Sequence, residues 1–173
     1  RNCRYLQRNR RLLVRLAHTG PQVMSRRATP DAGLDIIKHF EGWSATPYIC
    51  PAAHATIGWG AIWGLDGKRV TMNHPEINKD EGTLLLKRDL RICERAVLRL
   101  IDTELTDNQY SSLVSFTYNL GAGSLQSSTL RRKLNRGEYE SAAREFSRWV
   151  FAGGRRLRGL VLRRQAETEL FLS

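Results

Sequence analysis

The 173-residue sequence lacks the features that define several classes of protein. Its apolar runs are only a few residues long, far short of the ~20 residues that a membrane-spanning helix needs. Its three cysteines are too few for a disulfide scaffold, and it has no CxxC pair or histidine cluster that would suggest zinc. A hydrophobic content of 41% is sufficient for a buried core. We therefore expect a folded protein with no metal centre and no cofactor.

Acidic residues are absent from the first 30 positions, which hold eight arginines. This segment carries +8 of the formal net charge of +11 and leaves +3 for the rest of the chain. Its leucines can share one helical face, so residues 1–30 are predicted to form a basic amphipathic tail. Such a tail could lie on an anionic membrane surface, or it could be a solvated extension or part of a leader. Because the rest of the chain is nearly charge-balanced, we do not expect binding to nucleic acid.

The rest of the chain alternates between helical and irregular patterns. Thr29-Pro30-Asp31 predicts the start of a helix that ends near Gly42. The glycine-, proline- and aromatic-rich stretch that follows has no helical period, and its short strands are predicted at 56–60 and 68–70. A long amphipathic helix is predicted over about 78–102, and a cluster of shorter helices follows it. Their expected ranges are 106–120, 127–135, 138–149 and 159–172.

This order of elements predicts a mainly α-helical α+β fold with two lobes. A small β-hairpin lobe would cover about 44–75, and a helical lobe would cover about 78–173. The long helix could join the two lobes, and a cleft between them would suit a large ligand. Residues 31–173 would then form one domain behind the tail of residues 1–30.

Glu41 is the first candidate catalytic residue. It lies at the end of the first predicted helix, where the helix dipole is negative, and it has Phe40 and Trp43 as neighbours. Both the dipole and an apolar environment favour a carboxyl that keeps its proton near neutral pH, as a general acid requires. An ordinary solvent-facing glutamate is the competing interpretation.

The residues around and after Glu41 resemble the phage-type lysozymes, the endolysin muramidases. The resemblance runs from about residue 32 to residue 172. It rests on several segments in the same order: Glu41-Gly42, Pro47-Tyr48, Thr56-Ile57-Gly58-Trp59-Gly60, residues 105–110 and 115–121, Gly153-Gly154 and Arg163-Arg164. It implies a two-lobed, mainly helical lysozyme-like fold.

The resemblance also implies an activity and a partner. The enzyme would hydrolyse the β-1,4 bond between N-acetylmuramic acid and N-acetylglucosamine in peptidoglycan and so lyse the host cell. It would be made in the bacterial cytoplasm and act on peptidoglycan in the periplasm or cell wall. Peptidoglycan is therefore the expected partner, and action as a monomer is the simplest expectation.

The same resemblance assigns three catalytic positions. The family uses a glutamate as acid, an aspartate nine residues later and a threonine six residues beyond, and these positions hold Glu41, Cys50 and Thr56. Cys50 departs from this pattern, since the usual glycosidase scheme needs two carboxylates. Cys50 could position water together with Thr56, as an inverting mechanism favours, or it could attack the anomeric carbon. It could also be a small buried residue without a catalytic role.

Further residues have two interpretations each. Tyr48 could stack on a sugar or close the core of the hairpin. Asn119 lies where the family places an amide that contacts sugar, and a hydrogen bond at the helix end is its alternative. Arg163 or Arg164 could pair with a carboxylate near Glu41, whereas a solvated basic face is the commoner fate of such residues.

Two hypotheses concern the tail. In relatives exported with a membrane-anchoring leader, a disulfide to the active-site cysteine keeps the enzyme inactive, and Cys3 could form such a bond with Cys50 here. The competing function is a membrane-active or wall-binding antibacterial protein that acts through residues 1–30.

Overall fold

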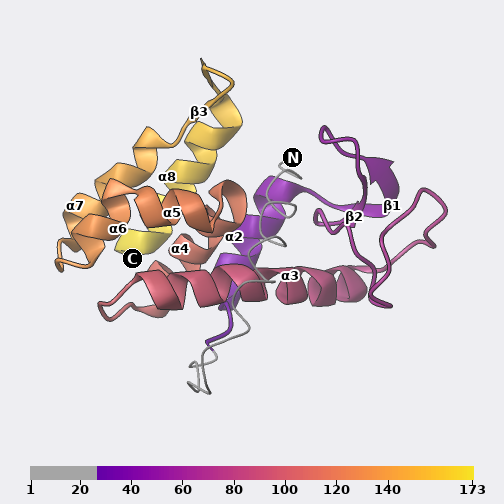
Figure 1. Cartoon of the computed structure of the whole chain (residues 1–173), viewed down its shortest axis with the longest axis horizontal. Helices are drawn as coiled ribbons and strands as arrows, with labels where there is room; N and C mark the ends of the chain where they lie inside the picture. The colour runs from indigo at the N-terminus through magenta and orange to yellow at the C-terminus, as the bar shows by residue number, and fades with distance from the viewer. Residues whose placement is uncertain (1–26) are drawn as a thin grey trace. The chain divides into compact units, whose positions relative to one another are not determined.

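The computed structural model describes residues 27–173, and most of the predicted tail therefore lies outside the described residues. The elements are α2 (Asp31–Glu41), β1 (Ser44–Ile49), β2 (Ala55–Gly58), α3 (Lys79–Leu100), α4 (Asp107–Leu120), α5 (Ala122–Ser127), α6 (Thr129–Leu134), α7 (Tyr139–Ala143), a 3-10 helix (Arg144–Arg148), β3 (Phe151–Ala152), β4 (Arg155–Arg156) and α8 (Arg158–Leu172) (Figure 1). The sheets within residues 27–173 are two short antiparallel hairpins. The predicted mainly helical α+β class is confirmed.

The described chain divides into two compact units. One unit contains Glu41–Ile92, and the other contains residues 27–40 and Cys93–Ser173. The division falls inside α3, so this long helix contributes to both units. None of the helices between residues 27 and 173 has the length and apolar character needed to cross a bilayer. The predicted domain and lobe bounds stay a prediction.

One strand of the first hairpin differs from the prediction. β2 overlaps the predicted strand 56–60, and its antiparallel partner is β1, which the sequence did not predict. Residues 68–70 form no strand and contribute only an isolated antiparallel bridge between Arg69 and Trp63. Pro47 lies inside β1, and the register shifts between Ser44 and Tyr48. Because proline cannot donate to a strand ladder and a register shift interrupts the alternation of side chains, this strand has no regular sequence pattern.

The long helices begin at capping boxes. Asn78 Oδ1 accepts hydrogen bonds from the backbone N–H groups of Asp80 and Glu81 at 2.9 Å, and Glu81 accepts from the Asn78 N–H at 2.9 Å. Thr106 and Gln109 make the same reciprocal pair at the start of α4, at 3.2 and 3.0 Å. Each box satisfies N–H groups that have no partner within the helix, and both boxes are where the sequence predicts them.

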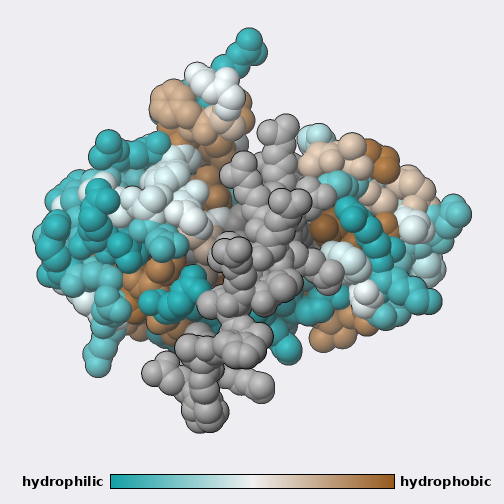
Figure 2. All heavy atoms as spheres, in the orientation of Figure 1, coloured by the Kyte–Doolittle hydropathy of each residue, from teal (hydrophilic) through white to brown (hydrophobic). Residues whose placement is uncertain are grey.

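The helices in the last third of the chain are shorter than predicted. The helix expected over 127–135 is reduced to α6, because Ser128 caps it by accepting a hydrogen bond from the Arg131 N–H at 3.0 Å. The helix expected over 138–149 is α7 followed by the 3-10 helix. Figure 2 shows mostly hydrophilic residues over the short helices α6 and α7. The buried residues of these two helices are apolar: Leu130 and Leu134 in α6, and Ala142 and Ala143 in α7.

α4 is the central helix of the second unit. Every residue from Tyr110 to Asn119 is buried, which is the signature of a helix surrounded by other elements. Phe116 lies edge-on to Phe146 and Trp149, with ring centroids 5.5 and 5.4 Å away. These aromatic contacts form the core that holds α4 to the following helices.

Tyr110 makes the stability of this unit depend on pH. Its buried hydroxyl donates to the carbonyl oxygen of Arg27 at 2.7 Å. Burial raises the pKa of Tyr110, as do the charges of Glu94 and Cys93, while the Arg27 guanidinium opposes them. The folded state therefore keeps the phenol neutral at a pH where the unfolded chain ionises it. The resulting stabilisation is complete below about pH 10 and is lost as the pH rises further.

We expect Tyr110→Phe to be less stable than the wild type by about 1 kcal/mol at pH 7, because the buried hydrogen bond is lost. This difference should disappear near pH 11, since ionisation of the unfolded tyrosine costs the wild type about 1.4 kcal/mol per pH unit above its ordinary pKa. Urea unfolding of both proteins between pH 7 and 11 measures the difference. A constant gap across that range would contradict this account.

Candidate active site

Glu41 is the last residue of α2, and only 7% of its surface is exposed. Gly42 follows with φ of 70°, the left-handed conformation that glycine adopts at helix ends without strain. The helix thus ends where the sequence predicts, and the Glu41 carboxyl is buried at the negative end of the helix dipole. This is the placement expected of a general acid rather than of a solvent-facing glutamate.

Trp43, two residues after Glu41, packs against Trp59. Its ring centroid lies 4.5 Å from that of Trp59, and the two rings are tilted by 52°. Gly82, in the first turn of α3, lies directly beneath this pair. A Cβ atom at position 82 would come within 2.4 Å of the Trp43 ring and 3.1 Å of the Trp59 ring. The missing side chain therefore allows both rings to pack against α3.

Gly82→Ala should destabilise the protein by about 1–3 kcal/mol, because the new methyl group would displace the Trp43 ring. The expected sign is opposite to that of helix propensity, which favours alanine by about 1 kcal/mol. Gly159 in α8 is the matched control, since nothing lies within 4 Å of a Cβ placed there. Gly159→Ala should be neutral or stabilising in thermal unfolding. A similar response of the two variants would mean that the tryptophan pair does not depend on Gly82.

A tight turn between β1 and β2 holds Cys50 and Thr56 together. The carbonyl oxygen of His54 accepts hydrogen bonds from the Cys50 N–H at 2.9 Å and from Thr56 Oγ1 at 3.0 Å. The Ala53 N–H donates to the Cys50 carbonyl at 2.8 Å, and Ala53 has φ of 60°, a conformation that non-glycine residues rarely adopt. One carbonyl group thus links Cys50, at the start of the turn, to Thr56 in β2.

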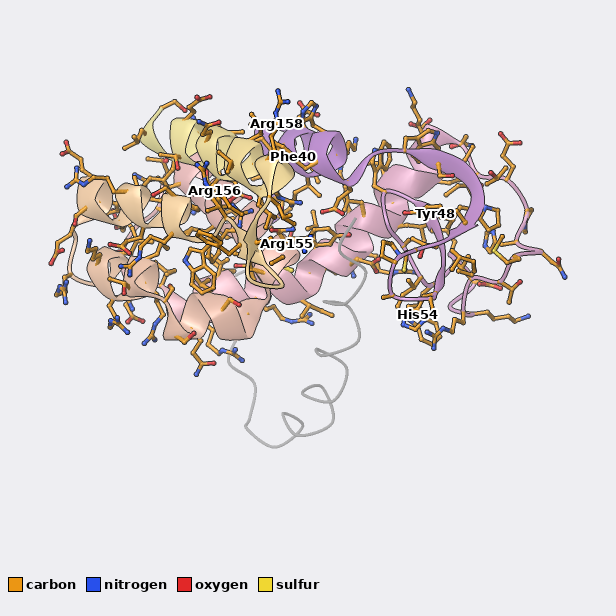
Figure 3. All side chains as sticks on the ribbon, turned by 90° about the horizontal axis from the view of Figure 1, so that it is seen from above. Phe40, Tyr48, His54, Arg155, Arg156 and Arg158 are labelled. Carbon is orange, nitrogen blue, oxygen red and sulfur yellow. The ribbon has the colours of Figure 1, made fainter. Side chains whose placement is uncertain are left out.

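Both side chains are buried inside the first unit. Cys50 packs with Ile62, and Tyr48 and Trp63 lie against this pair. Tyr48 is half-buried on β1 and is the cross-strand partner of Thr56 (Figure 3). Three of the predicted catalytic residues and Tyr48 therefore belong to the same compact unit. The environment of Cys50 also fits a small apolar residue.

Two arginines that the sequence did not single out support this loop. Arg69 Nη2 lies 3.1 Å from His54 Nδ1. Arg88 on α3 donates to the Trp63 carbonyl at 2.8 Å. Arg88 also pairs with Asp89 at 3.0 Å, where burial raises the pKa of Asp89 and the guanidinium opposes that rise. The contacts of Arg69 with His54 and of Arg88 with Trp63 are non-local and leave no periodic signal in the sequence.

Asn119 belongs to the second unit and is buried in a polar network. Its Oδ1 accepts from Arg164 Nη2 at 3.2 Å, and Arg164 also donates to Glu167 at 2.8 Å. Arg163 donates to the same carboxylate at 3.2 Å. The expectation of a solvated basic face at Arg163 and Arg164 is wrong, because both are buried around Glu167. The spacing of three and four residues between these arginines and Glu167 on one helix is the signal that could have predicted the network.

The cysteines in residues 27–173, Cys50 and Cys93, are both buried, and no disulfide joins them. Cys93 on α3 thus faces inward as its helical position predicts. Cys3 lies outside the described residues, so the disulfide to Cys50 stays a hypothesis.

The part of the chain that contains the candidate site is similar to known proteins. The family model described as phage lysozyme matches residues 38–167, which include Glu41, Cys50, Thr56 and Asn119. The chain belongs to the phage lysozyme family. The resemblance predicted from the sequence is therefore confirmed.

Individual members of the phage lysozyme family match most of this chain. An endolysin of Bacillus phage B103 is 38% identical over 146 residues, which are 82% of this chain and 53% of that protein. An endolysin of Acyrthosiphon pisum secondary endosymbiont phage 1 is 35% identical over 147 residues, 83% of this chain and 97% of that protein. The solved endolysin from Escherichia coli O157:H7 phage FAHEc1 has a TM-score of 0.77 and 32% identity, with 87% of this chain and 96% of that chain covered.

The chain spans about half the length of the Bacillus phage relatives that it matches. The matched part nevertheless contains the whole candidate site of the first unit, from Glu41 through the β1–β2 turn to the first turns of α3.

Proposed function

We propose that this member of the phage lysozyme family hydrolyses the β-1,4 bond between N-acetylmuramic acid and N-acetylglucosamine in bacterial peptidoglycan. Its similarity to endolysins and the buried carboxyl of Glu41 at the end of α2 carry this proposal. The protein would be made in the host cytoplasm, would act on peptidoglycan in the periplasm or cell wall, and would thereby lyse the cell.

Glu41 is the proposed general acid. Its proton passes to the glycosidic oxygen of the leaving sugar as the bond from that oxygen to the anomeric carbon breaks. Burial excludes competing water from the carboxyl and keeps it in one orientation. Asn119 and Tyr48 are the proposed sugar contacts, and Tyr48 would present its ring as a stacking surface.

Cys50 and Thr56 are proposed to position the attacking water. Thr56 Oγ1 donates its hydrogen to the His54 carbonyl, and in the proposed mechanism the same hydroxyl oxygen accepts a hydrogen bond from the attacking water. The oxygen of that water bonds to the anomeric carbon on the face opposite the leaving group and loses a proton to the surrounding solvent. The product would have inverted anomeric configuration.

A covalent route through Cys50 is the less favoured mechanism. In it, Sγ bonds to the anomeric carbon while the glycosidic bond breaks, and water later releases the sugar with retained configuration. Ile62, Tyr48 and Trp63 pack around Cys50, and this route additionally requires the thiol to lose its proton before Sγ attacks. The anomeric configuration of the first product, measured by NMR, separates the two routes.

Cys50→Ala should slow digestion of purified sacculi by at least about tenfold without unfolding the protein, since a group that positions water contributes less than the 10²–10⁴-fold of an acid or base. Cys50→Ser should retain more activity, because a hydroxyl still forms hydrogen bonds. Cys93→Ala removes the other buried thiol and should digest sacculi at the wild-type rate. Equal rates for Cys50→Ala and the wild type would remove Cys50 from the mechanism.

Mass spectrometry of the fragments released from purified sacculi tests the proposed function. Hydrolysis predicts fragments that end in reducing N-acetylmuramic acid. Fragments that end in 1,6-anhydromuramic acid would instead indicate a lytic transglycosylase, and free stem peptides would indicate cleavage of a peptide bond. The competing function through residues 1–30 rests on residues outside the described part and stays a prediction.

A further inference from the structure

The end of the second unit carries a surface that is both basic and apolar. No acidic residue occurs between Glu145 and Glu167, a stretch that holds six arginines. Within it, the segment from β3 to the start of α8 exposes three arginines (Arg155, Arg156 and Arg158). The same segment exposes Phe151 by 61%, Leu157 by 43% and Leu162 by 47%. We name residues 151–162 the basic hairpin.

The hairpin geometry places both kinds of side chain together. Phe151 pairs with Arg156 across the two strands, and Ala152 pairs with Arg155. Directly paired residues of antiparallel strands project from the same face, so an aromatic ring and a guanidinium lie side by side. Gly153 has φ of 58°, which allows the tight turn that joins the strands. Figure 1 shows β3 projecting beyond the helices of its own unit, and Figure 3 labels the three arginines there.

The fold does not use these three arginines. Among residues 27–173, their side chains make no hydrogen bond or ion pair with one another or with any other residue. The arginines of the same stretch that support the fold do make such contacts: Arg148 pairs with Glu145 at 3.2 Å, and Arg164 with Glu167 at 2.8 Å. The hairpin arginines are therefore available for an anionic partner.

The apolar residues are exposed in the same place. Single exposed apolar residues are ordinary on protein surfaces, but here Phe151, Leu157 and Leu162 fall within twelve residues of chain and adjoin the unpaired cations. Figure 2 shows hydrophobic and strongly hydrophilic residues next to each other over this projection. This combination suits an interface that is anionic at its surface and apolar just beneath.

We propose that the basic hairpin binds the headgroup surface of an anionic phospholipid membrane. The arginines bind lipid phosphates, and Phe151 and Leu157 enter the boundary between headgroups and acyl chains. A glycan strand offers sugar faces on which an aromatic ring can stack, but it has no apolar layer for the exposed Leu157 and Leu162 to enter. The binding does not depend on the proposed hydrolysis, because the hairpin supplies none of the residues proposed for it.

Binding of the full chain to phospholipid vesicles tests the role of charge. The test variant replaces the hairpin arginines by glutamine (R155Q, R156Q and R158Q). The control removes the same charge from exposed positions of α3 (R91Q, R95Q and R99Q). On vesicles that contain phosphatidylglycerol at low salt, the hairpin variant should bind about 100-fold more weakly than the wild type, at roughly fivefold for each arginine. The α3 variant should lose less than about fivefold, and vesicles of phosphatidylcholine alone should bind all three proteins weakly.

Phe151→Ser tests the apolar part of the hairpin. Its affinity for the anionic vesicles should fall by about tenfold, including at 0.5 M salt, where attraction between exposed charges is screened. Leu84→Ser is the control, because Leu84 is an equally exposed apolar residue of α3, at 58%, and this variant should bind like the wild type.

Binding and digestion of purified sacculi by the same variants form the second part of the experiment. Every variant should bind and digest sacculi like the wild type, and a failure of all proteins to digest them would count against the proposed function alone. The lipid proposal is overturned if the hairpin and α3 variants lose vesicle affinity equally, since only net charge would then matter. It is also overturned if the hairpin variants keep vesicle affinity, or if they lose affinity for sacculi instead.

Discussion

Glu167→Gln should lower the free energy of unfolding by about 3–5 kcal/mol, although the side chain keeps its size. Glu167 is fully buried and accepts hydrogen bonds from Arg163 at 3.2 Å, Arg164 at 2.8 Å and Ser115 at 2.7 Å. The amide carries no charge, so the two buried guanidinium groups lose their negatively charged partner. Urea unfolding at pH 7 measures the loss.

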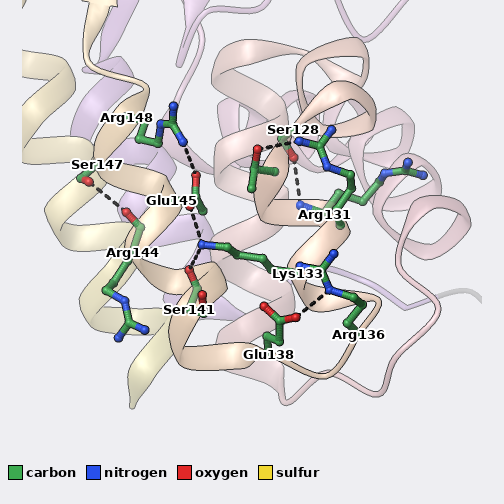
Figure 4. A network of polar contacts seen from close by, with 12 residues as sticks. Ser128, Arg131, Lys133, Arg136, Glu138, Ser141, Arg144, Glu145, Ser147 and Arg148 are labelled. Atoms are coloured by element: carbon green, nitrogen blue, oxygen red, sulfur yellow. Dashed lines mark hydrogen bonds and ion pairs between the residues drawn. The ribbon is translucent and has the colours of Figure 1, made fainter.

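Glu138→Gln is the matched control for this prediction. Glu138 pairs with Arg136 at 2.6 Å on the surface of the same unit, near the Lys133–Glu145–Arg148 contacts (Figure 4). Its pKa is lowered by the hydrogen bond from Arg136, yet both groups are solvated, so the unfolding midpoint should not change measurably. If Glu167→Gln were equally mild, the buried network would not be a source of stability.

The pH dependence of Glu167→Gln provides a second readout. Burial lowers the pKa of Arg164 to about 10, and Glu167 opposes this effect. A base whose pKa is lower in the folded state costs stability while it is charged, and this cost diminishes as the pH rises above the folded pKa. Without Glu167 the pKa of Arg164 should fall further. The deficit of the variant relative to the wild type should therefore shrink as the pH rises toward 10 and stay constant above it.

Local signals in the sequence predicted much of the fold. The capping boxes at Asn78 and Thr106 place the starts of α3 and α4 correctly, because each involves only four consecutive residues. The end of α2 at Glu41 follows from Gly42 in the same way. Signals of this kind depend on backbone groups within one turn of helix, so no knowledge of the tertiary structure is needed to interpret them.

Features that depend on distant residues could not be predicted. β1 contains Pro47 and a register shift, so its pairing with β2 is evident only once the strands are side by side. The role of the His54 carbonyl, which binds both Cys50 and Thr56, depends on the backbone path of the turn. The role of Gly82 likewise cannot be predicted from the sequence, because it depends on the packing of Trp43 against this position.

One residue of the candidate site could be predicted by a physical argument from the sequence, and the others only from the resemblance to a family. The position of Glu41 at a helix end beside aromatic residues is a physical argument from the sequence, and the structure agrees by burying the side chain. The choice of Cys50, Thr56, Tyr48 and Asn119 came from the resemblance to phage lysozymes, because a cysteine, a threonine, a tyrosine or an asparagine alone carries no such signal. The structure adds the hydrogen bonds that link both Cys50 and Thr56 to the His54 carbonyl.

Glu41→Gln should slow hydrolysis of peptidoglycan by about 10²–10⁴-fold. The amide has nearly the shape of a protonated carboxyl, so the fold and the binding of the glycan should be retained. It cannot release a proton to the leaving sugar oxygen, and the bond would have to break without acid assistance. Asp35→Asn, an exposed carboxyl-to-amide change on the same helix, is the control and should hydrolyse at the wild-type rate.

The most direct measurement is the initial rate at which reducing ends appear when isolated sacculi are treated with equal amounts of wild type, Glu41→Gln and Asp35→Asn. The unfolding midpoint of each protein is recorded alongside. The proposed mechanism predicts at least a hundredfold loss for Glu41→Gln alone, with unchanged midpoints. A folded Glu41→Gln protein that releases reducing ends as fast as the Asp35→Asn control would contradict it.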